Sequence, residues 1–405
     1  MKPANLILFF LLLTTFLFIE TTISKAITDT LFAEADNTLY ENNSGGFSNG
    51  NGNYFFAGKT NIGYLRRGLI RFAADTKIPP GAVITGVTLR LYMSRTISLT
   101  ASISLHKVTS EWGEGTSVAL GNEGSGTSPE QNDATWIHSK YPDEFWSNPG
   151  GDFSATASAV SNVNSMGYYT WSSAQMVTDV QNWVNNPCTE YGWMLIGNEA
   201  VTASTKRFDT RENFTVVNRP VLIVQYNYNH SGLVFDGIPE GFRTASGISA
   251  HDTMKVFLRN SSSPYTIIDN AKICKGIQGA VSFLSAATGS FYIQVSHRNS
   301  ISVWSANTVS YTSSGTVKKY LFTPCACQAF GSNQVQIFGK NCFYGGDTNQ
   351  DGIVDATDYS EIDNAANEFI SGYVNSDLTG DEIVDGTDAS ICENNASNFI
   401  AVISP

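Results

Sequence analysis

The chain has 405 residues and carries 24 Lys and Arg against 36 Asp and Glu, for a formal net charge of −12. A chain of this length is too long for one ordinary hydrophobic core, so we expect several domains. Residues 346–405 hold nine Asp, four Glu and no Lys or Arg, so they carry −13 and the remainder is close to neutral. The acidity is therefore local, and it does not describe a generally acidic protein that repels polyanions. We expect no nucleic-acid partner.

The N-terminus has the pattern of a secretory signal peptide. Met1 and Lys2 precede a mostly apolar run over residues 6–19, and Ser24 and Ala26 offer small residues at positions −3 and −1 of a cleavage site. The apolar run is shorter than the roughly 20 residues of a transmembrane helix. We expect residues 1–26 to be removed, which leaves no membrane span and a secreted, extracellular or cell-surface protein. An uncleaved anchor is the alternative.

Residues 27–228 are expected to form a β-rich first domain, because short strand-like runs alternate with turns rich in Gly, Ser, Thr and Asn. Residues 83–93 alternate, which predicts a half-buried antiparallel strand with Val83, Thr85, Val87 and every second residue up to Met93 on one face. Residues 220–226 predict a closing strand. A helix is expected around residues 176–184, whose apolar side chains fall on one face.

This domain carries several short motifs in a definite order. They are RRGLIRF (66–72), IPPGA (78–82), EWGEG (111–115), ATW (134–136), GWML (192–195), KRFDTRE (206–212) and RP (219–220). Their order resembles the DNRLRE domain, also classed as carbohydrate-binding module family 96, over nearly the whole domain. The resemblance implies a jelly-roll-like β-sandwich of a kind that often accompanies polysaccharide-degrading enzymes. Some members bind acidic polysaccharides such as alginate through basic residues.

The same resemblance implies ligand-binding roles for basic residues in two of these motifs, RRGLIRF and KRFDTRE. These residues are Arg67, Arg71, Lys206, Arg207 and Arg211. Arg suits carboxylates because its planar fork donates two parallel hydrogen bonds. The alternative is that these arginines pair with Asp209 and Glu212 inside the sandwich, whereas Lys206 and Arg207 are expected to be exposed. An exposed aromatic pair is a second route to sugar binding. Its candidates are Tyr141, Phe145, Trp146, Tyr168, Tyr169 and Trp171.

Residues 232–340 are expected to form a small immunoglobulin-like sandwich that acts as a spacer, with strands around 254–258 and 291–295. Structural disulfides are expected in an exported protein, but the sequence leaves the pairing open among Cys188, Cys274, Cys325, Cys327, Cys342 and Cys392. A bridge within the cluster Cys325, Cys327 and Cys342 would pin the acidic C-terminal segment to the domain before it.

Two aspartate-rich stretches, 347–358 and 377–388, place oxygen-bearing side chains at positions 1, 3, 5, 9 and 12 of a 12-residue loop. This is the spacing of a loop that wraps a calcium ion, with a backbone carbonyl at position 7. The predicted ligands are Asp347, Asn349, Asp351, Ile353, Asp355 and Asp358 in the first loop and Asp377, Thr379, Asp381, Ile383, Asp385 and Asp388 in the second. Glu382 replaces the usual Gly at position 6, so we expect the second of the two sites to be the weaker.

A similar stretch follows each loop at an offset of 30 residues, as the pairs Ser360/Ser390 and Phe369/Phe399 illustrate, and nothing before the first loop looks helical. A duplicated loop-then-helix unit with Asp at position 12 resembles the type I dockerin over residues 346–405. The resemblance implies calcium-dependent docking onto a cohesin-like partner. The tail lacks the Lys/Arg pairs common in cellulosomal dockerins, which argues against a cellulosome-type cohesin. The run HRNS (297–300) resembles a sequence of bacterial surface proteins with similar tails, and His297 is expected to be structural. A solvated acidic linker is the alternative for the tail.

No HExxH, Gly-x-Ser-x-Gly, P-loop or dinucleotide motif occurs, so we do not expect an enzyme. A glycosidase-type carboxylate pair stays open, with Glu114 and Asp152 as candidates. The sequence predicts a mainly β, multidomain protein: a jelly-roll-like β-sandwich, an immunoglobulin-like β-sandwich and an α-helical dockerin-like calcium module.

The predicted function is that of a secreted, non-catalytic carbohydrate-binding protein, with acidic polysaccharide as a candidate ligand, attached to a partner or surface through its calcium tail. The alternatives are a structural cell-surface or matrix protein that assembles through the tail and, third, a polysaccharide lyase or hydrolase.

Overall fold

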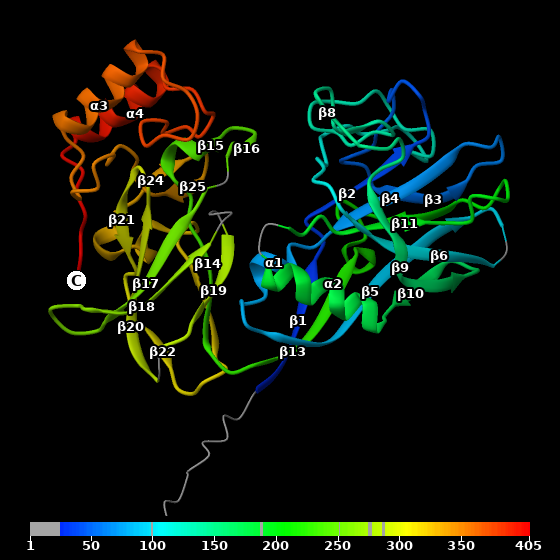
Figure 1. Ribbon diagram of the computed structural model, residues 1–405, viewed down its shortest axis with the longest axis horizontal. Coiled ribbons are helices and arrows are strands. Elements are labelled where there is room, and N and C mark those ends of the chain that lie inside the picture. Colours follow the sequence, from blue (N-terminus) through cyan, green and yellow to red (C-terminus); the bar gives the residue numbers. More distant parts are fainter. Residues whose placement is uncertain (1–24, 99, 187–188, 251, 274–277, 286–287) are drawn as a thin grey trace, which may run out of the picture.

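The computed structural model describes residues 25–405 apart from 99, 187–188, 251, 274–277 and 286–287. Residues 1–24 of the predicted signal peptide, Cys188 and Cys274 lie outside the described residues. The described chain is mainly β, with two regions of curled sheet and a small helical tail (Figure 1). We name residues 25–228 the first region, 231–345 the second region and 346–405 the tail. No helix in the described part of the chain is long and apolar enough to span a membrane.

The first region is a sandwich made from one curled sheet. Its strands are β1 (Lys25–Phe32), β2 (Ala35–Tyr40), β3 (Tyr54–Lys59), β4 (Leu65–Arg71), β5 (Val83–Thr96), β6 (Ala101–Val108), β9 (Phe153–Val163), β10 (Gly167–Trp171), β11 (Trp193–Ile196), β12 (Lys206–Asp209) and β13 (Val221–Tyr228). They follow the order β1-β13-β5-β12-β3-β4-β11-β6-β9, with β10 beside β5 and β2 beside β4. Because β3 belongs to both halves, the sheet folds over one core that includes Leu89, Trp193 and Phe208.

The smaller elements of this region are the hairpin β7 (His138–Lys140) and β8 (Glu144–Phe145), the helices α1 (Ala74–Lys77) and α2 (Ala174–Asn185), and the 3-10 turn η1 (Val216–Asn218). The predicted helix is confirmed as α2. Ser173 caps it by accepting a hydrogen bond from the Met176 N–H at 3.0 Å, which satisfies a donor that has no partner within the helix. Met176, Val180 and Trp183 are buried on the face turned to the sheet.

The strand predicted over residues 83–93 exists, but its core face is only partly as expected. Val87, Leu89 and Met93 are buried, whereas Val83 is 59% exposed and Ile84 is buried instead. The register between β5 and β13 shifts where Gln225 pairs with Gly86 and Tyr226 pairs with Ile84. A one-residue bulge moves every side chain beyond it to the opposite face, so the prediction for Val83 and Thr85 is wrong.

The second region packs two sheets around a shared core. One sheet has the order β18-β17-β20-β21 with β22 beside β20, and the other has the order β19-β14-β23. The strands are β14 (Ser231–Asp236), β17 (Met254–Asn260), β18 (Ile267–Ile273), β19 (Gln278–Phe283), β20 (Gly289–His297), β21 (Ser300–Trp304), β22 (Val309–Tyr311) and β23 (Val317–Leu321). Phe235, Leu258 and Ile293 lie in this core. The expectation of a second β-sandwich is confirmed.

Short elements complete the second region: η2 (Glu240–Phe242), β15 (Arg243–Thr244), β16 (Gly247–Ile248), η3 (Ala326–Gln328), η4 (Phe330–Ser332), β24 (Val335–Ile337) and β25 (Lys340–Cys342). Cys325 and Cys327 form a disulfide at η3, while Cys342 and Cys392 are free and buried. The expectation that a bridge in this cluster pins the tail is wrong, because the bridge joins two residues of one short turn.

The tail contains α3 (Ala356–Asn367) and α4 (Gly386–Ser397), each directly after one aspartate-rich loop. Both helices begin with the same capping box, in which an Asp caps the first turn and the Asp three residues later accepts the N–H of the capping residue. The two helices lie side by side next to the second region (Figure 1). Ile301 from β21 joins Ile362 and Leu378 in the core of the tail, so the tail is packed against the second region.

Candidate functional site

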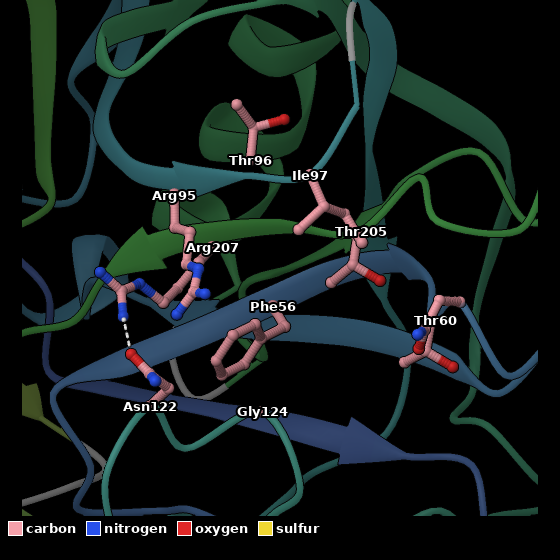
Figure 2. A pocket seen from close by; sticks show the side chains of 10 residues that line it. Phe56, Thr60, Arg95, Thr96, Ile97, Asn122, Gly124, Thr205 and Arg207 are labelled. Carbon is pink, nitrogen blue, oxygen red and sulfur yellow. Dashed lines mark hydrogen bonds between the residues drawn. The ribbon is translucent and has the colours of Figure 1, made fainter.

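A cavity of about 190 Å³ opens on the first region between β3, β5 and β12 (Figure 2). Phe56 and Ile97 contribute apolar walls, and Arg95 and Arg207 lie together at one side. The remaining lining comes from Thr60, Asn61, Thr96, Asn122, Gly124 and Thr205. Apolar walls with a few convergent polar groups are typical of a ligand pocket, although this one is smaller than the roughly 300–1,000 Å³ of sites for drug-sized molecules.

Arg95 and Arg207 face each other across β5 and β12, where they are register partners. Like charges directly opposite one another destabilise a sheet. The Arg207 guanidinium lies 3.6 Å from the centroid of the Tyr54 ring and donates to Ser94 Oγ at 3.1 Å. Neither arginine forms an ion pair with any described residue, and Arg95 is exposed. In the described part of the chain, neither positive charge has a carboxylate within ion-pair distance, and Asp209 and Glu123 act on Arg207 only from farther away.

One wall of the cavity is a rigid loop around Glu123. Glu123 is buried, and its Oε2 accepts hydrogen bonds from Asn49 Nδ2 and from the Tyr54 N–H, both at 2.9 Å. The Tyr40 hydroxyl donates to the carbonyl of Glu123 at 2.8 Å. These bonds hold Glu123 in a left-handed backbone conformation with φ of 63°. The loop therefore fixes Asn122, whose Oδ1 accepts a hydrogen bond from Arg207 at 3.4 Å.

Of the five basic residues predicted to bind ligand, only Arg207 lines this cavity. Arg67 makes a bidentate ion pair with Glu199 at 2.7 and 3.0 Å and also donates to the Gly150 carbonyl. Arg71 lies 3.4 Å from a Glu34 oxygen and over the Trp112 ring. These two arginines are therefore engaged within the fold, with carboxylate partners other than Asp209 and Glu212.

The expectation that Lys206 is exposed is wrong. Its ammonium group is held inside the sheet and donates to Thr96 Oγ1 at 2.5 Å and to the carbonyl and hydroxyl of Ser98 at 3.0 Å. Lys206 and Arg207 are consecutive residues of β12, so their side chains point to opposite faces of the sheet. Arg211 forms ion pairs with Glu114 and Glu212, the second at 2.8 Å. It therefore follows the alternative prediction, in which an arginine pairs with a carboxylate of the same domain.

Sequence reasoning missed Arg95, which pairs with Arg207. Its signal was weak because it lies two residues beyond the alternating pattern that defined the strand. Continuing that strand to Thr96 and pairing it with β12 would have brought the two arginines together. The expected aromatic pair is absent from the described candidates: Phe145 and Tyr168 are exposed, but they lie on β8 and β10, well apart (Figure 1).

In both candidate calcium loops, predicted ligand side chains accept hydrogen bonds from the backbone of the same loop. Asp347 Oδ2 accepts the Gly352 N–H, and Asp377 Oδ2 accepts the Glu382 N–H, both at 3.2 Å. The other predicted ligands lie in the same turns, and all of their carboxylate contacts are to backbone or nearby side chains. Asn349, Asp351, Asp355, Thr379, Asp381 and Asp385 form these turns, and Ile353 and Ile383 occupy position 7.

One atom of the first loop fits a cation directly. Asp347 is 2% exposed, yet its Oδ1 has no hydrogen-bond partner. Burial, with the neighbouring charges of Asp358 and Asp351, raises the pKa of Asp347 to about 6. An oxygen-only set of hard ligands with an unpartnered buried carboxylate suits Ca²⁺. Asp347, Asn349, Asp351 and Asp358 are the side chains that would hold the ion.

The carboxylate oxygens of each loop do not all converge on one point. Asp358 accepts the Thr348 and Asp355 N–H groups at 2.9 and 3.1 Å, and Asp388 accepts those of Leu378 and Asp385 at 2.8 and 2.9 Å. No three acidic groups of either loop, among the residues described, place ligand atoms within 4.8 Å of one another. Asp358 and Asp388 are instead bonded to the backbone of their own loops.

Backbone strain does not distinguish the two loops. Glu382 has φ of 65° at position 6, as expected, but Gln350 has φ of 61° at position 4 of the first loop, where the second has Gly380. Each loop thus holds one non-glycine residue in the left-handed region. A different feature separates them: Arg298 Nη2 lies 3.7 Å from Asp377 Oδ2. The guanidinium cancels part of the negative charge that this loop offers to a cation, so the second loop stays the predicted weaker site.

The two carboxylates considered for glycoside cleavage are engaged in the fold. Asp152 accepts the Ser147 and Asn148 N–H groups at 2.8 and 3.0 Å, and despite its burial these bonds lower the pKa of its carboxyl. Glu114 is bound to Arg211 and to the Asp36 N–H. His297 is buried and bonded to Asp252 at 3.1 Å, which agrees with its expected structural role.

No family model matches the chain, and no curated protein matches it, so neither resemblance drawn from its motifs is matched by a family. Solved structures similar to parts of it include a C-terminal interface mutant of a type II Cohesin-X-Dockerin complex from Acetivibrio cellulolyticus, at 16% identity and a TM-score of 0.28. An N-terminal interface mutant of that complex has 13% identity and a TM-score of 0.26. Each covers 42% of this chain and 99% of its own. TM-scores this low do not establish a shared fold.

Proposed function

We propose that the chain is a secreted, non-catalytic protein that binds a carboxylate-bearing polysaccharide and attaches to a partner or surface through its calcium-folded tail. The observation that supports this best is the pair Arg95 and Arg207, two guanidinium groups that face each other without an ion-pair partner among the described residues. Retaining such a pair against its mutual repulsion is expected where an anionic ligand supplies the missing charge.

The cavity suits one acidic sugar unit of a longer chain. The two guanidinium groups would receive the carboxylate in a bidentate manner, and the apolar walls from Phe56 and Ile97 would receive the less polar face of the ring. Because the cavity is small and Arg95 is exposed, the rest of the polymer would remain outside on the surface. Alginate, a polymer of uronate units, is the probe that this geometry favours.

Affinity electrophoresis in gels containing alginate tests the proposal with the full-length protein. Arg95→Gln combined with Arg207→Gln should weaken retention by about 10- to 100-fold, since a hydrogen bond to a charged group contributes about 1.5–3 kcal/mol. Arg90→Gln is the matched control, because it removes the same charge from the same strand outside the cavity. A gel that contains a neutral glucan is the control for slower migration caused by the polymer without binding.

Equal retention of the double variant and the wild type, or equal loss in Arg90→Gln, would contradict a specific site. Release of unsaturated or reducing sugars from alginate would instead favour the lyase or hydrolase alternative.

The attachment role rests on a separate observation in the tail. Phe369 and Phe399, which are 30 residues apart at matching positions of the two repeats, are 90% and 88% exposed, so each repeat offers one large apolar group for a contact with a partner protein. A cohesin-like or cell-surface protein is the proposed partner. Size-exclusion chromatography with calcium and with a chelator separates the alternative of self-assembly: calcium-dependent oligomers of the pure protein would favour a structural matrix role.

A further inference from the structure

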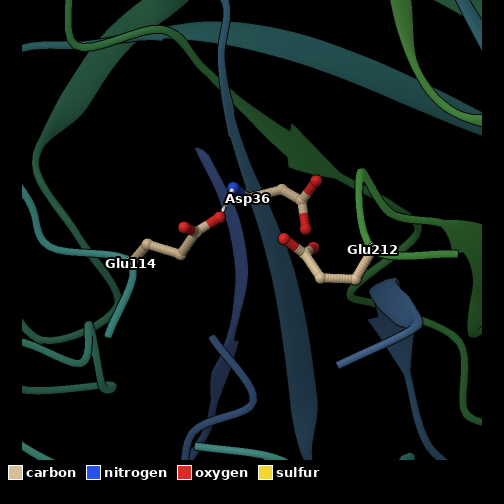
Figure 3. A group of neighbouring side chains, drawn as sticks. All are labelled: Asp36, Glu114 and Glu212. Atoms are coloured by element: carbon tan, nitrogen blue, oxygen red, sulfur yellow. Dashed lines mark hydrogen bonds between the residues drawn. The ribbon is translucent and has the colours of Figure 1, made fainter. Parts of the chain in front are cut away.

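Three carboxylates from separate parts of the first region meet beside β2. Asp36 lies in β2, Glu114 in the loop between β6 and β7, and Glu212 in the turn after β12 (Figure 3). Each offers one oxygen such that all three oxygens lie within 4.8 Å of one another. In the described chain this is the one group of three acidic side chains that is so closely assembled.

Two oxygens in this group have no partner. Asp36 has no exposed surface; its Oδ2 accepts the Arg211 N–H at 2.8 Å, but its Oδ1 accepts no hydrogen bond. Glu212 Oε1 pairs with Arg211 Nε at 2.8 Å, and its buried Oε2 also accepts none. Figure 3 shows the carboxylates of Asp36 and Glu212 turned toward each other. Leaving a buried, ionised oxygen without a partner is strongly unfavourable, so the geometry calls for a positive group between them.

The charge of the group indicates what that positive group is. Three carboxylates and the guanidinium of Arg211, the one ion-paired with them among the described residues, sum to −2. Arg71 acts on Glu114 from a greater distance but is paired with Glu34, and Arg219 acts on Glu212 but donates its Nε to the Asn213 carbonyl. One divalent cation would neutralise the remainder. All the available ligands are oxygens, which selects a hard ion rather than a thiolate- or imidazole-seeking metal. Calcium–oxygen distances of roughly 2.3–2.6 Å allow ligands on opposite sides of one ion to lie about 5 Å apart.

We infer that Asp36, Glu114 and Glu212 bind a calcium ion that ties β2, the loop before β7 and the turn after β12 together. This site lies in the first region, apart from both loops of the tail, and does not depend on the proposed function. A buried acid outside this group shows a different arrangement. Glu190, for example, is buried beside Asp75, but both its oxygens accept backbone N–H groups, at 3.1 and 3.2 Å.

The chain contains a built-in reporter for the site. Six of its seven Trp residues lie in the first region and none in the tail, so Trp fluorescence follows unfolding of the first region. Full-length protein is stripped with a chelator and dialysed against CaCl2, and bound calcium is then counted by mass spectrometry. Asp347→Ala with Asp377→Ala, which disables the tail loops, should retain one calcium per chain. That calcium should raise the Trp-monitored unfolding midpoint by several degrees.

Asp36→Asn with Glu212→Gln should bind one calcium fewer than the wild type. Added to the variant with disabled tail loops, this pair should abolish the remaining calcium and the shift of the midpoint. Glu190→Gln is the matched control, because it changes a buried glutamate outside the group. It should keep both the bound calcium and the shift of the unfolding midpoint.

The inference is overturned if the tail-disabled variant binds no calcium, a result that does not require any variant of the group itself to fold. It is also overturned if Asp36→Asn with Glu212→Gln keeps the full calcium complement. A midpoint that responds to pH but not to calcium would show that the carboxylates share a proton instead.

Discussion

Asp252 joins the second region to the tail, and its replacement by Asn is expected to loosen the tail selectively. Asp252 Oδ2 accepts bonds from His297 Nε2 at 3.1 Å and Arg298 Nε at 2.6 Å, and Oδ1 accepts the hydroxyl of Tyr373 at 2.6 Å. Arg298 in turn donates to the carbonyl of Val374 and lies over the Tyr373 ring. Although burial alone would raise it, these bonds hold the pKa of Asp252 well below its ordinary value.

The size of the effect follows from the contacts that cross into the tail. Tyr373 bonds to Asp252 directly, and Arg298 depends on Asp252 for its position. A hydrogen bond to a charged group contributes about 1.5–3 kcal/mol, and breaking a buried ion pair from one side costs about 3–5 kcal/mol. We therefore expect Asp252→Asn to lower the free energy of opening the tail by about 3 kcal/mol, which is roughly a hundredfold in the opening equilibrium.

Hydrogen–deuterium exchange of the calcium-loaded, full-length protein measures this opening. Peptides from α4 and from the loop before it should lose protection by roughly a hundredfold, while the strands of the first region stay unchanged. Asp236→Asn is the matched control, since the Asp236 carboxylate accepts three bonds from Phe322 and Thr323 inside the second region. The reasoning fails if protection of the tail is unchanged in Asp252→Asn, or if Asp236→Asn lowers it equally.

Three further predictions follow from other contacts. Removing calcium should melt α3 and α4, because the −13 charge of the tail is then unneutralised; unchanged far-UV circular dichroism in excess chelator would contradict this. Lys206→Met should lower the free energy of unfolding by about 2–3 kcal/mol without weakening alginate retention of the folded protein, because the buried ammonium donates hydrogen bonds to Thr96 and Ser98. A loss of retention with unchanged stability would instead support a role for Lys206 in ligand binding. Burial beside Asp75 raises the pKa of Glu190 to about 7, so the folded state holds a proton that the unfolded state has released. Stability should therefore fall between about pH 4.5 and pH 7, by at most about 3 kcal/mol, and Glu190→Gln should flatten that slope in denaturation curves at several pH values.

Local patterns predicted the elements better than they predicted the contacts. Helix α2 and the two loop-then-helix units follow from spacing along a short stretch, and the structure confirms those helices. The face of β5 was misjudged at Val83 because a bulge depends on the partner strand, which alternation within one strand does not reveal. The ligand arginines were misjudged for a similar reason. Arg67, Arg207 and Arg211 look alike in sequence, yet Glu199 and Glu114, which occupy two of them, are far away along the chain.

The predicted calcium ligands are an intermediate case. Their spacing identified both loops, and the unpartnered oxygen of Asp347 agrees with a cation. The contacts of Asp358 and Asp388 with loop N–H groups, and the position of Arg298 beside Asp377, needed the folded structure. The acidic group around Asp36 left no sequence signal, because its members are separated by 78 and 98 residues and only the sheet brings them together.

Backbone hydrogen bonds connect each repeat of the tail to the other. Val384 N–H donates to Ile370 in the segment after α3, and Val354 N–H donates to Ile400 in the segment after α4, at 3.1 and 2.8 Å. Ile353 also bridges to Ala401, and Val402 N–H donates to the Gly352 carbonyl at 2.8 Å. The first loop is thus completed by residues that follow α4 in the second repeat. Loss of residues 400–402 would therefore also impair the first loop, although that loop lies in the earlier repeat.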